Sequence, residues 1–259
     1  MLQTTHGDLT LLHFPRLARE TGLAHAITTK PQNYAPHRGN DREAALDARR
    51  RVCRILGLEY DRLTSPEQVH GGEVVAVENA DIGRGRDGRG TAVRYVDGLL
   101  CDRPGVPLIL LSADCPLICV YDPRRRAAGA VHASWQGTVA HATVNLVAQM
   151  TRLFGCDPTR LLAAISPSAG PCCYEVGHDV RRIAQGKLDH ADTFFTPRND
   201  RFLFDLWSAN HAQLTASGVH PDNIEIAGLC SICDHHFWSH RRDGADAGRS
   251  ALFLALRDR

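Results

Sequence analysis

The stretch VPLILLSADCPLICVYD (residues 106–122) contains two apolar runs with a short break at residues 113–116. Each run has the length and composition of a buried β-strand. The next segment, RRRAAGAVHAS (residues 124–134), predicts a tight turn and a third strand that ends at His132. A cysteine, Cys115, and a histidine therefore stand at the ends of neighbouring predicted strands. Both lie beside small residues, which leave room for a ligand.

Outside this stretch, predicted strands and helices are mixed without strict alternation. Asp41 is a candidate N-cap for a helix that runs to Leu56 and stops at Gly57. Apolar residues recur at helical spacing over residues 139–153, which predicts one helix there. This order favours mixed β-sheets with flanking helices over a doubly wound parallel sheet.

Length and composition restrict the class of function. The chain has 259 residues, 43% of them hydrophobic, which is enough for a sizeable core. Its net charge of +1 gives no electrostatic reason to expect nucleic acid or an anionic membrane as a partner. The N-terminal segment lacks the pattern of a secretory signal, and no apolar run approaches the ~20 residues that span a bilayer. We expect a cytoplasmic protein that acts on a small molecule, with its nine cysteines as free thiols.

A glycine-rich loop matches the pattern G-x-G-x-x-G through Gly83, Gly85 and Gly88. A dinucleotide-binding fingerprint requires a strand before the glycines and a helix after them. Here a strand-like segment follows, so the loop is expected to be an exposed turn.

A second pattern, C-x-x-C, is formed by Cys230 and Cys233 and is followed by three histidines, His235, His236 and His240. A structural zinc site is one interpretation of such residues. It would need two further ligands from a second knuckle, and the histidines are closely crowded. Thiols that pack at a strand end, followed by a histidine-bearing loop, are the favoured interpretation. Cys172 and Cys173 are likewise expected to be packing residues.

His70, Cys115 and His132 form the third group of interest. Each stands at a predicted strand edge or strand end with small neighbours. Taken singly, each also has a structural explanation, because a buried cysteine is commonly a small hydrophobe and a buried histidine a hydrogen-bonded core residue. Spacing alone does not choose between a site and a packed core.

Five motifs stand out along the chain: EQVHG (67–71), SADCPLICVYD (112–122), AVHASWQGTVAHATV (130–144), GPCCYEVG (170–177) and FWSHRRDGADAGR (237–249). In sequence and in order they resemble the motifs of the laccase-domain family, a bacterial group labelled multicopper polyphenol oxidase whose members include purine nucleoside phosphorylases. The resemblance covers roughly residues 25–257. It implies an α+β fold, with a mixed, sandwich-like β-sheet core flanked by helices, and we expect a single domain over residues 1–259.

The resemblance implies one zinc ion per chain, bound by His70, Cys115 and His132. Two imidazoles and one thiolate leave a fourth position open, as a catalytic zinc site requires. The implied reactions are phosphorolysis of adenosine, inosine, guanosine or methylthioadenosine, and deamination of adenosine. The implied partners are a purine nucleoside and phosphate, and the protein is expected to be a monomer or a homodimer.

The expected catalytic residues are the three metal ligands and Asp114. Asp114 is expected either to orient a ligand histidine or to act as general base, with a cap in a tight turn as the structural alternative. Glu175 matches the GPCCYEVG motif. It is expected either to orient a group in the substrate site or to begin a helix.

Several residues depart from the family pattern. The family's H-A-G-W-R-G is HASWQG here, so Ser134 replaces a glycine and Gln136 replaces an arginine. Because a guanidinium binds phosphate with a bidentate fork that glutamine lacks, this departure bears on phosphate use more than on metal binding. The candidates to compensate are four basic residues: Lys30, which replaces the arginine of T-T-R, and Arg38, Arg241 and Arg242.

Copper chemistry is not expected, because no two of the 14 histidines form the H-x-H pairs common in multicopper sites. Two further hypotheses stay open. One is a metal-free Cys–His hydrolase or amidase that acts on a small molecule such as a peptidoglycan precursor, with Cys115 as nucleophile and His70 or His132 as base. The other is a zinc-binding protein whose site has lost catalysis.

Overall fold

The computed structural model describes residues 1–39 and 41–258, which form 14 β-strands and six α-helices. The strands are β1 (Leu2–His6), β2 (Leu9–His13), β3 (Leu23–Thr28), β4 (Val74–Ala76), β5 (Gly98–Cys101), β6 (Leu108–Ser112), β7 (Leu117–Asp122), β8 (Ala127–His132), β9 (Leu162–Ile165), β10 (Glu175–Val176), β11 (Phe195–Arg198), β12 (Arg201–Phe204), β13 (Ile224–Ile226) and β14 (Ser250–Leu256). The helices are α1 (Arg42–Leu56), α2 (Trp135–Val139), α3 (Ala142–Phe154), α4 (His178–Gln185), α5 (Leu206–Ala216) and α6 (His240–Asp243).

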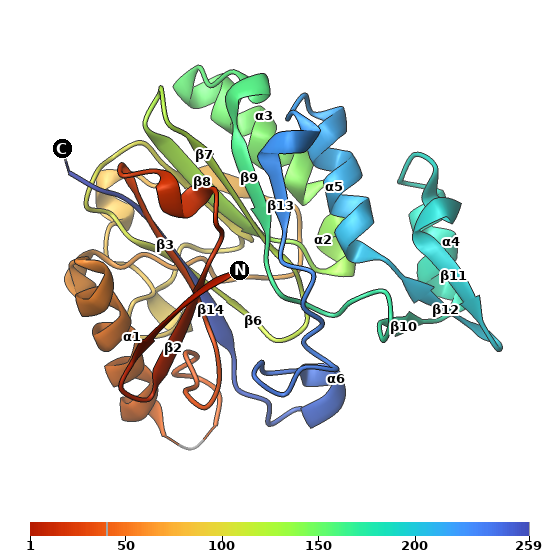
Figure 1. Ribbon diagram of the computed structural model, residues 1–259, viewed down its shortest axis with the longest axis horizontal. Helices are drawn as coiled ribbons and strands as arrows, with labels where there is room; N and C mark the ends of the chain where they lie inside the picture. Colours follow the sequence, from red (N-terminus) through yellow and green to blue (C-terminus); the bar gives the residue numbers. More distant parts are fainter. Residues whose placement is uncertain (40, 259) are drawn as a thin grey trace.

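Two large sheets form the centre of the molecule. The five-stranded sheet has the order β1-β2-β3-β14-β6, and all its neighbours are antiparallel. The six-stranded sheet has the order β13-β9-β7-β8-β5-β4, with parallel pairs at its two edges. A smaller three-stranded sheet, β10-β12-β11, lies to one side with α4 (Figure 1). The expected α+β fold with a mixed, sandwich-like core is confirmed.

The molecule is built in four layers. One apolar core lies between the two large sheets, where Leu110 and Leu252 of one sheet pack with Leu99 and Cys119 of the other. A second core joins the five-stranded sheet to α1. A third joins the six-stranded sheet to α3 and α5. Figure 1 shows α1 on one side of the sheets and α3 and α5 on the other. Among the described residues, no helix is both long and apolar enough to span a membrane.

The SADCP segment is the point where the chain passes from one large sheet to the other. β6 belongs to the five-stranded sheet and β7 to the six-stranded sheet. Asp114 makes the turn with a left-handed φ of 90°. β7 then pairs with β8 so that Leu117 lies opposite His132. This register places Cys115 and His132 at the same end of the sandwich.

The helix predicted over residues 42–56 is confirmed with both its caps. The Asp41 side chain accepts a hydrogen bond from the Ala44 amide, and Gly57 ends the helix with a φ of 70°. The helix predicted over residues 139–153 is confirmed over most of its length as α3. Its predicted start is wrong, because the chain breaks between α2 and α3 at His141, whose φ is 58°. The loop after His70 packs at this break: a Cβ on Gly72 would lie 2.6 Å from the Ala140 carbonyl oxygen.

The glycine-rich loop is packed and not an exposed turn, so that part of the prediction is wrong. Gly85 is buried, and a Cβ there would lie 2.8 Å from the Ser65 carbonyl oxygen. The Gly85 carbonyl accepts a hydrogen bond from the buried Arg49 guanidinium at 3.0 Å. A short 3-10 turn, Arg89–Thr91, follows the loop in place of the helix that a dinucleotide site needs.

Candidate metal and substrate site

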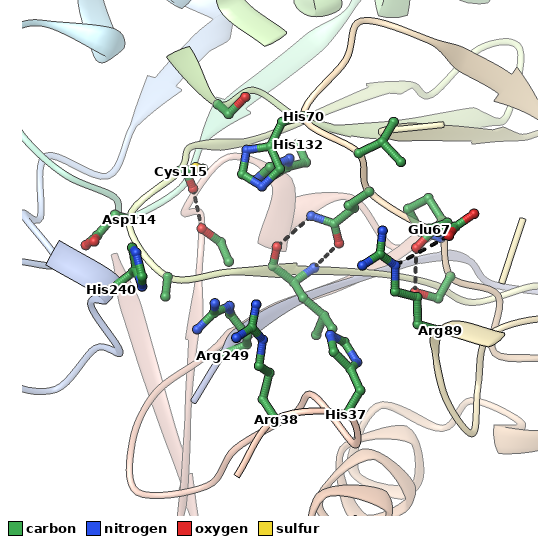
Figure 2. A pocket seen from close by; sticks show the side chains of 18 of the residues that line it. His37, Arg38, Glu67, His70, Arg89, Asp114, Cys115, His132, His240 and Arg249 are labelled. Carbon is green, nitrogen blue, oxygen red and sulfur yellow. Dashed lines mark hydrogen bonds and ion pairs between the residues drawn. The ribbon is translucent and has the colours of Figure 1, made fainter. Parts of the chain in front are cut away.

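His70, Cys115 and His132 meet at one end of the sandwich. Their ligand atoms, one from each residue, all lie within 4.8 Å of one another. The two imidazole rings are perpendicular, with centroids 4.8 Å apart. Figure 2 shows the three side chains grouped on one side of the pocket. The structure thus brings together the three residues expected to bind a metal.

Gln68 of the EQVHG motif fixes the segment that carries His70. Its amide group forms two hydrogen bonds with the backbone of Leu111 on β6, donating to the carbonyl at 2.7 Å and accepting from the N–H at 2.9 Å. Gln68 therefore pairs with β6 as a neighbouring strand would. His70 follows with a left-handed φ of 64°, which turns the chain at the pocket.

Asp97, a fully buried residue just before β5, connects two of the candidate ligands. Its carboxylate accepts hydrogen bonds from the amides of Val69, His70 and Gly71 at 2.7–3.1 Å. It also lies 2.9 Å from Nδ1 of His132. Burial raises the pKa of Asp97, but His132 and these amides outweigh burial and hold the pKa below its ordinary value. The ionised carboxylate must accept, so His132 donates through Nδ1 and has Nε2 free for a metal.

The two histidines have opposite electrostatic environments when no metal is bound. Burial lowers the pKa of His132, but Cys115 and Asp97 outweigh burial and raise it to about 9. The pKa of His70 is lowered, first by burial and then by His132. A divalent ion would replace the proton at Nε2 of His132, while the Nδ1 proton would stay on the hydrogen bond to Asp97. Two imidazoles and a thiolate, one imidazole held by a carboxylate, are a donor set that fits a single zinc ion.

The hydrogen bonds of the Asp114 carboxylate go to residues other than the candidate metal ligands. Its Oδ1 accepts from the Ser231 hydroxyl and its Oδ2 from the Arg241 amide, both at 2.7 Å. The carboxylate that contacts a candidate ligand histidine is that of Asp97, and the expectation that Asp114 does so is corrected. Asp114 instead joins the β6–β7 turn to the segment that carries Arg241.

The candidate ligands open into a cavity of about 740 Å³. Arg38 and Arg249 line it, and the ion pairs among the described residues include no carboxylate partner for either guanidinium. His37 also lines it, and burial followed by Arg38 and other arginines lowers the pKa of His37 to about 4. In Figure 2 these three residues lie on the side of the pocket opposite His70 and His132. The wall away from the candidate ligands therefore carries the two guanidinium charges of Arg38 and Arg249, beside a neutral His37.

The other residues expected from the sequence fall into two groups. Gln136 and Arg241 line the cavity. Lys30 and Glu175 lie outside its lining: Lys30 pairs with Asp243 at 3.1 Å, and Glu175 pairs with Arg201 at 3.2 Å. Arg242 also lies outside and donates to Asp243 and to backbone carbonyls.

Sequence reasoning missed Asp97, Arg249 and His37. Asp97 directly precedes a glycine and a buried apolar strand, which is an unusual place for a charge and is a usable signal. Arg249 closes the motif FWSHRRDGADAGR, but nothing in the motif distinguishes it from the basic residues Arg241 and Arg242. His37 carries no signal in the sequence beyond its neighbour Arg38.

A second cluster lies outside the cavity and consists of Cys172, Cys173, Cys230 and Cys233, whose sulfur atoms all lie within 4.8 Å of one another. The expectation that Cys172 and Cys173 are packing residues is wrong, because Cys172 is exposed and Cys173 half-buried. The histidines that follow Cys233 are not members of this cluster.

Fold and site together define a four-layer β-sandwich protein with a pocket at one end of the sandwich, where two histidines and one cysteine meet. Residues 16–257 match the family model described as multi-copper polyphenol oxidoreductase laccase, and the chain belongs to this family. The purine nucleoside phosphorylase YlmD of Geobacillus stearothermophilus is 34% identical over 87% of this chain and 84% of that protein. Adenosine deaminase RL5, from an unknown prokaryotic organism, is 32% identical over 84% of each chain. The crystal structure of YlmD from G. stearothermophilus superimposes with a TM-score of 0.91, at 31% identity, over 99% of this chain and 98% of that one.

Proposed function

We propose that this protein is a zinc-dependent purine nucleoside phosphorylase with adenosine deaminase activity, which takes adenosine, inosine, guanosine or methylthioadenosine. The observation that carries the proposal is that one cavity is lined by three candidate metal ligands and by two guanidiniums that have no carboxylate partner among residues 1–39 and 41–258. A volume of about 740 Å³ is in the range of ligand sites and suits a nucleoside together with phosphate. The names of the relatives YlmD and RL5 support the same two reactions.

His70, Cys115 and His132 would hold one zinc ion. When bound, zinc supplies Lewis-acid chemistry at the fourth, open position. The group offers two histidines and one thiolate, which suits one zinc ion better than the several coppers of an oxidase. Asp97 orients His132 and holds it in the tautomer that can bind a metal.

Arg38 and Arg249 would bind the phosphate. A phosphate dianion in a cavity is stabilised by charge-assisted hydrogen bonds from guanidinium groups, which bind it in a bidentate manner. These two residues supply the charge that Gln136 lacks. Gln136 itself lines the cavity and would contact the nucleoside through its amide.

Arg241 and Tyr174 would form the wall beside the nucleoside. The Arg241 guanidinium lies 5.0 Å from the centre of the Tyr174 ring and donates to the Glu175 carbonyl at 2.6 Å. Asp114 fixes the Arg241 backbone, so its part in the reaction is to position this wall. Glu175 acts through its carbonyl on Arg241.

A metal-free Cys–His hydrolase is the second candidate, and one observation favours it. The raised pKa of His132, about 9, rests partly on Cys115, as in the imidazolium–thiolate pairs of cysteine nucleophiles. In this alternative the Cys115 sulfur attacks the carbonyl carbon of an amide, and His132 gives its proton to the departing amine. Water then hydrolyses the thioester and regenerates the Cys115 thiol.

Product analysis tests the main proposal. The zinc-loaded protein is incubated with each of the four nucleosides, with and without phosphate. If free base and the corresponding pentose 1-phosphate form only when phosphate is present, the reaction is phosphorolysis. Inosine formed from adenosine, with or without phosphate, indicates deamination. The absence of turnover with all four nucleosides would overturn the proposal.

A further inference from the structure

The structure assigns a second metal site to this protein: a structural zinc ion held by Cys172, Cys173, Cys230 and Cys233, which we call the four-cysteine cluster. It is separate from the pocket metal and does not depend on the proposed enzymatic activity. Cys172 and Cys173 lie between β9 and β10, and Cys230 and Cys233 follow β13. The two pairs are about 60 residues apart in the sequence.

The spacing of the sulfur atoms fits one tetrahedral ion. Zinc–sulfur bonds of about 2.3 Å place the sulfurs of a tetrahedral site about 3.8 Å apart. In the cluster, Cys233 Sγ lies 3.0 Å from Cys173 Sγ and 3.5 Å from Cys172 Sγ, and all four sulfurs lie within 4.8 Å. Four protein thiolates complete the coordination, which is the arrangement of a structural and not a catalytic zinc site.

Packing does not explain why these thiols converge. Cys172 and Cys233 are exposed and Cys173 is half-buried, so they bury little apolar surface. Thiols are weak hydrogen-bond donors, and four of them gain little from meeting one another. Binding of a divalent ion would stabilise the four thiols at this spacing, because the thiolate is the form that ligates zinc.

The backbone around Cys230 is also arranged as in a metal knuckle. Cys230 and Cys233 have the C-x-x-C spacing, and the Asp234 amide donates to the Cys230 carbonyl at 2.8 Å to close the turn. The buried Cys230 sulfur accepts a hydrogen bond from the Gly170 amide at 3.2 Å. Such N–H donors stabilise a thiolate and orient it toward an ion.

The four-cysteine cluster lies behind one wall of the cavity. Tyr174, which lines the cavity, directly follows Cys173. Ser231, which directly follows Cys230, donates to Asp114, and Asp114 in turn holds the Arg241 amide. A zinc ion at the cluster would join the two segments that carry Tyr174 and Arg241, and would fix this wall without contacting the substrate.

Zinc content per chain tests the inference, measured by inductively coupled plasma mass spectrometry on protein purified under reducing conditions. We expect about two zinc ions in the wild type. One is expected in Cys115→Ser, one in Cys172→Ala/Cys233→Ala and none in the triple variant. Cys156→Ala, a buried thiol outside both groups, is the control and should keep two.

If the wild type holds one zinc ion and Cys115→Ser loses it, the zinc assignment to the four-cysteine cluster is overturned and the proposed function stands. If the wild type holds one zinc ion and Cys172→Ala/Cys233→Ala loses it, the cluster binds zinc and the proposed zinc ion of the pocket is overturned. A Cys173–Cys233 disulfide found by mass spectrometry in the reduced preparation would also overturn the cluster.

Two further measurements address geometry and role. X-ray absorption at the zinc edge on Cys115→Ser should show four sulfur neighbours at about 2.3 Å, and a shell dominated by nitrogen or oxygen would contradict the assignment. Hydrogen–deuterium exchange should be faster over residues 168–176 and 229–242 in Cys172→Ala/Cys233→Ala than in Cys156→Ala. Equal exchange in the two variants would show that the ion does not join these segments.

Discussion

Nδ1 of His132 donates a hydrogen bond to Oδ1 of Asp97 across 2.9 Å. Both residues are buried, and Asp97 also binds the amides of the segment that carries His70. One carboxylate therefore sets the tautomer of one candidate ligand and the backbone position of another.

Asp97→Asn should weaken zinc binding at the pocket by about 10–100-fold, the usual effect of losing a hydrogen-bonded partner of a metal ligand. Asparagine carries no charge, and its NH₂ group would face amides that now donate to the carboxylate. Competition with a chromophoric chelator, in a Cys172→Ala/Cys233→Ala background, measures the affinity. Asp122→Asn is the matched control, because Asp122 is equally buried and accepts backbone amides in the β7–β8 turn. Equal affinities in the two variants would contradict the role of Asp97.

Arg38→Ala and Arg249→Lys should each raise the KM for phosphate by about 10–100-fold, because a charge-assisted hydrogen bond contributes about 1.5–3 kcal/mol. Lysine keeps the charge of Arg249 but loses the bidentate fork. Initial rates of phosphorolysis over a range of phosphate concentrations give the KM. Arg152→Ala, on the exposed face of α3, should leave it unchanged. An unchanged KM in both cavity variants would place the phosphate elsewhere.

The reactivity of Cys115 toward alkylation distinguishes the metal enzyme from the Cys–His hydrolase. In the metal enzyme, zinc protects Cys115 from alkylation, and a chelator exposes it, because a ligated thiolate is not free to react. Iodoacetamide labelling followed by peptide mass spectrometry measures this. The hydrolase alternative predicts rapid labelling of Cys115 whether or not zinc is present, together with activity in chelator-treated protein.

His25 should make stability dependent on pH in a range below neutrality. The buried His25 accepts the Phe14 amide through Nε2 at 2.9 Å, and burial followed by His13 lowers the pKa of His25 from 6.5 to about 3. The unfolded chain therefore binds a proton that the folded chain does not. The stabilisation is present above pH 6.5 and is lost as the pH falls toward 3, by up to about 1.4 kcal/mol per pH unit.

His25→Gln provides the comparison, since the glutamine side-chain carbonyl can accept the Phe14 amide without titrating. Urea unfolding between pH 7 and pH 4 should show a shallower loss of the free energy of unfolding in His25→Gln than in the wild type. Equal slopes for the two proteins would show that His25 is protonated in the folded state.

Local signals predicted much of the fold, and long-range pairing accounts for what was missed. Asp41 and Gly57 delimit α1 because caps depend on their immediate neighbours. The break at His141 escaped prediction because the apolar spacing continues across it, while the packing of Gly72 against Ala140 is a tertiary contact. The sandwich itself forms because the chain passes from one large sheet to the other near Cys115, and no local pattern in the sequence specifies this crossing.

The same distinction holds for the site. His70, Cys115 and His132 were found through a family resemblance, since their spacing alone did not separate a ligand from a core residue. Asp97 and Arg249 reach the pocket through pairings with distant segments. The four cysteines appeared as two unrelated pairs, because their convergence depends on a contact between the segments after β9 and β13. Lys30 carries the right charge but is engaged by Asp243 and Trp238 outside the cavity.

The central claim is that His70, Cys115 and His132 share one zinc ion. Diffraction data collected on either side of the zinc absorption edge, from crystals of the wild-type protein, test it most directly. We predict an anomalous difference peak that disappears below the edge, at about 2.0–2.3 Å from an imidazole nitrogen of each histidine and from the sulfur of Cys115. A zinc-replete crystal without a peak among these three atoms would contradict the account.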